Sequence, residues 1–188
     1  MRRLALLALA ASALLAPAGP AAARDEESVS PLRLLNYTVS GGGVVPVGTA
    51  GEGIESGPHG SAAIHYDSGS GFMLGAEVGF TRSNDNLRTR IVAFGLSARI
   101  SPADFNAAYI KLGVGGYSLG YEPRSASTPS PGSLVRPGGS FGVGFELVHL
   151  PRVSFGLSGT YHRIAIATHD ARAFVALTLD VIYRPYEF

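Results

Sequence analysis

Apolar and small or polar residues alternate with a period of two through most of the chain after residue 30. In the segment GFMLGAEVGF, residues 71–80, large apolar side chains fill one set of alternate positions, and the other set is mostly glycine with one carboxylate, Glu77. Because alternate side chains of an extended strand point to opposite faces, the pattern predicts a strand with one apolar face. A half-exposed sheet would carry many charged residues on its second face, and this segment does not.

Seven further segments repeat the alternation, and none of comparable length shows helical periodicity. Most are about 10 residues or longer, against ~5 to 6 in globular sheets and ~9 to 11 for a tilted strand that crosses a bilayer. The alternation in the first predicted strand is less regular around Gly41 to Gly43. The predicted strands lie at residues 32–48, 61–67, 91–100, 107–117, 140–147, 153–162 and 174–183.

One face of these strands collects Val, Leu, Ile and Phe, and the other collects Gly, Ser and Ala. Small inward residues leave space in a narrow lumen, and lipid accepts large apolar side chains. We therefore predict an all-β fold, an eight-stranded antiparallel up-and-down transmembrane β-barrel. The positions expected to face lipid are Phe72, Leu74, Val78, Phe94, Leu96, Ile110, Leu112, Phe145, Phe155, Leu157, Leu177 and Leu179.

The connectors between the predicted strands broadly alternate between longer and shorter. Outer-membrane barrels have short turns on the periplasmic side and longer loops outside. The longest connector, EPRSASTPSPGSLVRPGG at 122–139, falls on the outer side. Aromatic residues fall near both ends of the predicted strands, where the aromatic girdles at the two membrane interfaces belong. Those near the inner, periplasmic ends are Tyr66, Phe72, Phe105 and Tyr183, and those near the outer ends are Phe80, Tyr121, Phe141 and Tyr161.

The N-terminal residues 1–23 read as a cleaved secretory signal peptide. Two arginines precede an apolar run at 4–15, and small residues come just before Arg24. A single membrane helix would need about 20 apolar residues, and the run breaks near Pro17. We expect export, a short N-terminal segment at 24–30, and a barrel over 31–188.

Composition excludes several function classes. The net charge is +1, and charged residues make up 15% of the chain, against about 25% in typical soluble domains. The charges are dispersed along the sequence and do not form a basic face, so we expect no nucleic-acid binding. The chain has no cysteine, which excludes a lipoprotein anchor, disulfides and thiolate metal sites. We expect no metal and no cofactor.

Ionisable residues on the glycine-bearing faces would point into the lumen. An eight-stranded barrel has just enough interior space for side chains to fill it, and an unpaired charge there would be costly. We expect a plug of paired side chains, with a gate that admits small ions as the alternative. The predicted network is Glu77, Arg99, Lys111, Glu146 and Asp180, with His65 and His162.

The chain resembles the small outer-membrane β-barrel superfamily, which includes the transmembrane domain of outer-membrane protein A. The resemblance rests on the signal peptide, on repeats such as GFMLGAEVGF and FGVGFEL, and on the terminal aromatic Phe188. It implies an outer-membrane location, outer-membrane lipid as a partner, and Phe188 as an assembly signal read by the barrel-assembly machinery. The ending RPYEF departs from the pattern, because Pro185 puts Phe188 out of phase with the last strand. We expect a monomer.

Several functions suit such a barrel. The first expectation is a structural or surface-exposed role, and the alternatives are a small-solute or ion pore, or an adhesin that acts through its outer loops. A soluble periplasmic lipocalin-like binder would instead need charged outer faces.

Some barrels of this fold are lipid-modifying hydrolases. The candidate groups here are His162, His169 and Asp170, with Ser158 and Thr160 on the same strand as His162. In the lipid A deacylases of this class, a serine lies at a set offset from a histidine, and no serine in this sequence lies at that offset from a histidine. We therefore expect no enzymatic activity.

Overall fold

The computed structural model describes residues 34–47, 55–82, 89–101, 107–121, 134–165 and 171–185. The predicted signal peptide, the segment 24–30, His169, Asp170 and the terminal Phe188 lie outside the described residues. In the part of the chain that is described, no helix is long and apolar enough to cross a membrane.

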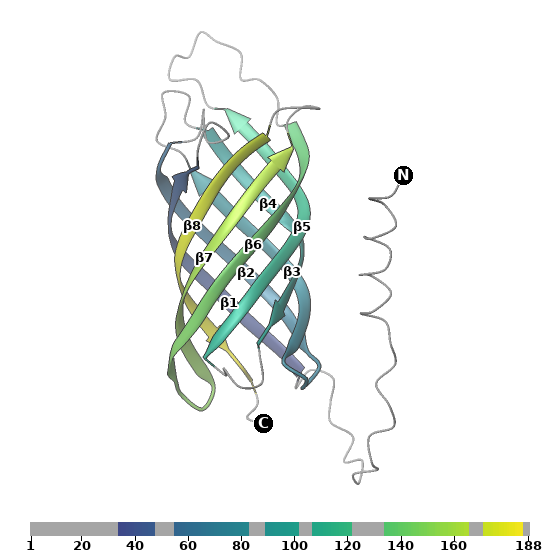
Figure 1. Cartoon of the computed structure of the whole chain (residues 1–188), viewed down its shortest axis with the longest axis vertical. Coiled ribbons are helices and arrows are strands. Elements are labelled where there is room, and N and C mark those ends of the chain that lie inside the picture. The colour runs from purple at the N-terminus through teal and green to yellow at the C-terminus, as the bar shows by residue number, and fades with distance from the viewer. Residues whose placement is uncertain are drawn as a thin grey trace, which may run out of the picture. The chain divides into compact units, whose positions relative to one another are not determined.

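The described residues form a closed barrel of eight antiparallel strands (Figure 1). Each strand pairs with its neighbours in the sequence, and β1 pairs with β8 to close the cylinder. The prediction of an eight-stranded antiparallel barrel is confirmed. The strands are β1 (Leu35–Pro46), β2 (Gly57–Asp67), β3 (Phe72–Arg82), β4 (Thr89–Ile100), β5 (Ala108–Tyr121), β6 (Leu134–His149), β7 (Val153–Ala165) and β8 (Ala171–Tyr183).

Several predicted strand boundaries differ from the structure, and the largest error is at the start of the sixth strand. Residues 134–139 were assigned to the longest loop, but they begin β6 and pair with residues 114–119 of β5. Pro137 and the two glycines after it are local turn signals. Pairing with β5 overrides them, since strand formation depends on the partner strand more than on local propensity.

The pairing also fixes the register of the first strand. Gly41 lies opposite Gly60 on one side and Leu179 on the other. Asn36 and Ser40 are buried and face inward, whereas Val39 is exposed and faces outward. The irregular glycine run therefore continues the same alternation as the other strands.

The two ends of the barrel have different connectors. At one end, residues 68–71, 101–107 and 150–152 join consecutive strands, and β1 begins and β8 ends there; we call this the turn end. Gly69 and Gly71 adopt positive φ values of 75° and 78° in the first of these turns, which glycine tolerates readily. The opposite, loop end has the strand ends joined through residues 47–56, 83–88, 122–133 and 166–170.

Gly95 of β4 and Gly115 of β5 face each other where the two strands approach closely. A Cβ atom built on Gly95 would lie 2.7 Å from the Gly115 Cα and even closer to the Val114 carbonyl oxygen. Only glycine fits this position. Glycines of this kind permit the coiling that a narrow barrel needs for closure.

Replacing Gly95→Val should lower the free energy of unfolding by about 1–3 kcal/mol, because the new side chain must displace backbone. The control is Gly79→Ala, where the nearest atom to the new Cβ is His59 Cε1 at 3.5 Å. Guanidinium unfolding in detergent, followed by far-ultraviolet circular dichroism, measures both. Equal losses for the two variants would contradict the close approach of β4 and β5.

Candidate functional site

The outward face of the barrel is almost entirely apolar. Outward side chains reach large exposed fractions, for example 61% for Leu96 and 66% for Leu179. The charged residues at outward positions of the described strands are Arg82, Arg90 and Arg163, all near the loop end. The middle and the turn end of the outer wall therefore present only apolar or small side chains in these strands.

The structure turns every position predicted to face lipid toward the outside. Phe72 is half-buried, and the other eleven of these side chains are exposed. Aromatic residues occur at both ends of this outer wall. At the turn end the outward rings of Tyr37 and Tyr183 lie 6.3 Å apart, and at the loop end the outward aromatics include Phe80 and Tyr161.

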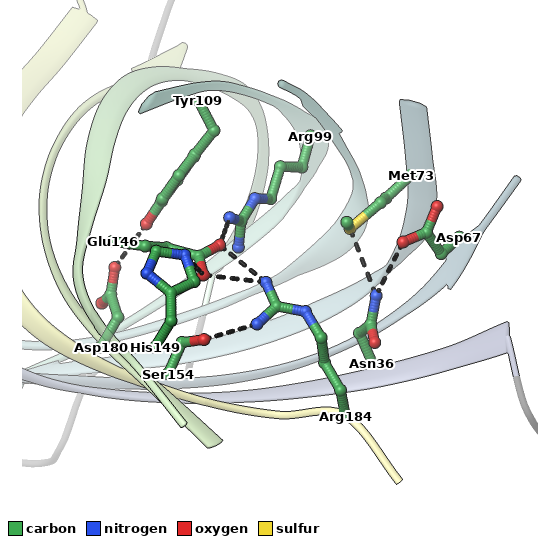
Figure 2. Close-up of polar contacts among 10 residues, drawn as sticks. All are labelled: Asn36, Asp67, Met73, Arg99, Tyr109, Glu146, His149, Ser154, Asp180 and Arg184. Carbon is green, nitrogen blue, oxygen red and sulfur yellow. Dashed lines mark hydrogen bonds and ion pairs between the residues drawn. The ribbon is translucent and has the colours of Figure 1, made fainter. Parts of the chain in front are cut away.

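Near the turn end, the side chain of Glu146 lies in the interior among the basic side chains that contact it (Figure 2). Arg99 pairs with Glu146 Oε1, and the two side chains are 6% and 2% exposed. Arg184, which follows β8, donates from Nη2 to both carboxylate oxygens at 2.7 and 2.9 Å. The same arginine donates from Nη1 to Ser154 Oγ at 2.6 Å, and His149 Nε2 lies 3.1 Å from Glu146 Oε2. Strands β4, β6 and β7 and the residue after β8 are thus linked through one carboxylate.

A second group surrounds Asp180. Tyr109 donates to Asp180 Oδ2 at 2.6 Å, and Thr178 donates to Oδ1 at 2.9 Å. The Arg99 guanidinium lies 3.7 Å from the centre of the Tyr109 ring, a cation–π distance that joins this group to Glu146. Figure 2 shows Tyr109 extending from the wall toward Asp180.

Near the same end, Asn36 Nδ2 donates to Asp67 Oδ2 at 3.3 Å and lies 3.5 Å from Met73 Sδ. These contacts link β1, β2 and β3 beside the groups around Glu146 and Asp180 (Figure 2).

The middle of the lumen contains a separate ion pair. Lys111 Nζ lies 2.6 Å from Glu77 Oε1, and each side chain is 17% exposed. His65 is hydrogen-bonded to Ser97 Oγ at 2.9 Å rather than to a carboxylate. The residues predicted as one charge network are therefore divided into local groups. Arg99 meets Glu146, Lys111 meets Glu77, and neither predicted histidine forms an ion pair among the described residues.

The interior near the loop end is apolar, which the sequence reasoning missed. Phe174, Ile91, Leu119 and Ile164 are each at most 1% exposed. The predicted plug consists of polar and charged side chains, whereas this layer of the interior is apolar. The full cluster is Val44, Ile91, Tyr117, Leu119, Ile164, Phe174 and Ala176, with Ala93 packed against it.

The missed layer gave only a weak signal in the sequence. Inward Ile91 is followed by outward Val92, and inward Phe174 is followed by outward Val175. Where both faces are apolar, the period-two contrast disappears locally. The rest of the strand still places Phe174 on the inward face, but nothing in the alternation indicates that the interior is apolar at this level.

Two histidines border the apolar layer. The His162 ring stacks on Phe174 with centroids 4.7 Å apart, and its Nδ1 is hydrogen-bonded to the Tyr117 hydroxyl at 3.0 Å. His59 Nδ1 is hydrogen-bonded to Thr81 Oγ1 at 2.8 Å. His162 is thus part of the packing of this layer.

Two small cavities lie inside the described part of the barrel. One cavity of about 30 Å³ touches His59, Glu77 and His162, and another of about 20 Å³ lies between His65, Lys111 and other inward side chains. A water needs roughly 10–15 Å³ of such space, so each cavity has room for about one or two waters.

The described residues do not assemble a hydrolase constellation. Ser158 Oγ is hydrogen-bonded to Thr178 Oγ1 at 2.8 Å, and the partner recorded for the His162 ring nitrogen is Tyr117. His169 and Asp170 lie outside the described residues. Among the residues that are described, no group of three or more His, Cys, Asp or Glu is placed to hold a metal ion.

Comparison with solved structures finds similar barrels. The crystal structure of Neisserial surface protein A matches with a TM-score of 0.57 and 11% sequence identity, covering 80% of this chain and 96% of that one. The N-terminal β-barrel domain of Pseudomonas aeruginosa OprF (TM-score 0.48, 9% identity) covers 79% of this chain and 97% of its own. Ail, the attachment invasion locus protein of Yersinia pestis, solved with the heparin analogue sucrose octasulfate (TM-score 0.48, 13% identity), covers 79% and 95%.

No protein-family model matches the chain, and no curated protein matches its sequence. The structural likeness to Neisserial surface protein A shows a shared fold, that of the small eight-stranded outer-membrane barrels.

Removing the carboxylate of Glu146 should destabilise the barrel strongly. Glu146→Ala leaves Arg99 buried without its anionic partner, and loss of one partner of a buried pair costs about 3–5 kcal/mol. Glu77→Ala is the matched control, since its pair with Lys111 is more exposed and should cost less. The measurement is the free energy of unfolding in guanidinium. A larger loss for Glu77→Ala would show that the Glu146 cluster is not the main polar contact of the lumen.

Proposed function

We propose that this chain, which has the fold of the small eight-stranded outer-membrane barrels, is an integral outer-membrane protein with a closed lumen. Its role is structural, or it presents the loop end at the cell surface. The barrel is a monomer and has no catalytic function. The observation that carries the proposal is the apolar outward face, in which the charged positions of the described strands occur only near the loop end.

Exposure of this apolar outward face to water would be energetically unfavourable. Soluble monomers rarely expose apolar patches beyond about 300–600 Å². Here outward side chains such as Leu96, Val114 and Leu179, on three different strands, are each more than half exposed. In a bilayer the same side chains gain a favourable environment, whereas an arginine at the midplane of a barrel wall would cost about 2–4 kcal/mol.

The arrangement of the two faces argues against a soluble lipocalin-like binder. Such a protein needs an apolar cavity beneath a charged outer surface, and here the wall is apolar outside while much of the lumen is polar. The connector lengths support an orientation with the turn end in the periplasm and the loop end outside. The likeness to a protein named as a surface protein agrees with exposure of the loop end.

Two layers in series support a closed lumen. Near the loop end, Phe174 and its neighbours fill the interior with apolar side chains. Closer to the turn end, the Lys111–Glu77 ion pair lies across the lumen. An ion would have to pass both an apolar constriction and a paired charge. The residues at 1–23 and Phe188 belong to the same proposal, as the export signal and the signal for the barrel-assembly machinery.

The proposal predicts heat-modifiable migration in electrophoresis. Protein extracted from outer membranes in detergent should migrate faster without boiling than after boiling, because a closed barrel resists dodecyl sulfate until heated. The protein should also enter lipid vesicles and resist extraction by carbonate. Release by carbonate together with identical migration under both conditions would exclude an integral barrel.

Conductance across a planar bilayer tests whether the lumen is closed. The unchanged protein should be silent, and Glu77→Gln or Phe174→Ala alone should remain silent because the other layer persists. The double variant weakens both of these layers and leaves only the turn-end groups around Glu146 and Asp180, so its conductance should exceed that of either single variant. Heat-modifiable migration of each variant confirms that its barrel is intact. A current from the unchanged protein, or from Glu77→Gln alone, would contradict closure by two layers.

A further inference from the structure

The outer wall of the barrel is hollowed by an apolar groove across β6, β7, β8 and β1. Its volume is about 440 Å³, and its floor includes Gly41 and Gly159. The strand register places these glycines beside the side chains that form the walls. The walls are Val143, Phe145, Leu157, Leu177 and Leu179.

The barrel itself does not require glycine at these two outward positions. A Cβ on Gly41 would meet nothing within 4 Å, and a Cβ on Gly159 would come no closer than 3.5 Å to Leu177 Cδ2. Neither glycine has a positive φ. Glycine weakens a strand, and it often marks a place where a ligand approaches the backbone closely. The groove therefore keeps open a space that a larger apolar side chain could have filled.

A cation lies on the same strand as the floor of the groove. Arg163 of β7 is exposed and faces outward, four residues beyond Gly159 toward the loop end, which is about 13 Å along a strand. Its cross-strand neighbours are Gly139 and Ala173, both of which have small side chains or none. Because barrel strands tilt by about 35–45°, this distance along the strand is about 10 Å of depth. The apolar band of such barrels is about 25 Å tall, and the long arginine side chain extends the guanidinium toward the headgroups when the groove lies near the middle of the bilayer.

We propose that this groove binds one acyl chain of an outer-leaflet lipid whose phosphorylated headgroup contacts Arg163. The inference rests on the proposed membrane location. The apolar walls match a hydrocarbon chain, and the guanidinium can donate two parallel hydrogen bonds to phosphate oxygens. A second copy of the chain fits the groove less well, because a two-fold interface sets a patch against itself, and two facing hollows would leave a void.

Native mass spectrometry of the detergent-purified protein tests the proposal. The probes are dioleoyl phosphatidylglycerol, which is anionic, and dioleoyl phosphatidylcholine, which carries the same chains but no net charge. We expect a one-lipid adduct that favours phosphatidylglycerol. Gly159→Leu and Gly41→Leu should each weaken this adduct about tenfold by filling the groove, and Arg163→Gln should abolish the preference between the two lipids.

Matched controls lie on the other wall of the barrel. Ala76→Leu adds an outward apolar side chain on β3, and Arg82→Gln removes an outward arginine near the loop end of the same strand. Both should leave the adduct unchanged. Adducts of equal strength in all variants, or none in the unchanged protein, would overturn the proposal.

Two further readouts separate this inference from the proposed function. Dimers of the unchanged protein that dissociate in Gly159→Leu would show that a second copy, not a lipid, occupies the groove. Heat-modifiable migration of every variant shows that the barrel is intact, so absence of the adduct then counts against the groove alone. Loss of heat-modifiable migration in the unchanged protein would instead count against the membrane barrel.

Discussion

The structure depends on the requirement that every backbone polar group find a partner where no water is available. In a bilayer, β-strands meet this requirement only when the sheet closes on itself, because a closed sheet has no edge strand with unpaired backbone groups. Here β1 pairs with β8 over ten residues on each strand, from Tyr37 opposite Tyr183 to Pro46 opposite Phe174. Closure then sorts the side chains, because alternate residues must face either the narrow lumen or the outer surface.

The lumen in turn determines which residues are possible inside. Near the turn end, buried charges are accommodated because Glu146 has two arginines and Asp180 has hydroxyl donors. Near the loop end, apolar side chains pack around Phe174 in the interior. The two solutions differ in chemistry, but in both the inward side chains contact one another across the interior.

The sequence predicted most of the fold, because the contrast between Leu or Phe and Gly or Ser persists along each strand. It failed where that contrast was absent. Ile91 and Phe174 are each followed by another apolar residue, so the apolar layer was not visible. It also failed where local turn signals around Pro137 conflicted with long-range pairing. The partners of single charges, such as Arg184 with Glu146, depend on cross-barrel distances that no single segment encodes.

The central claim is that the outward residues contact hydrocarbon. The chain contains no cysteine, so single cysteines carrying nitroxide spin labels can be placed along β4 at Ala93, Phe94, Leu96, Ser97 and Ala98 without background labelling. In vesicles, collision with oxygen should alternate with a period of two, because the outward sites contact hydrocarbon and the inward sites are packed in the lumen. High oxygen and low nickel accessibility is predicted at Leu96 and Ala98. High nickel accessibility at these outward sites would show that they face water and would contradict the account.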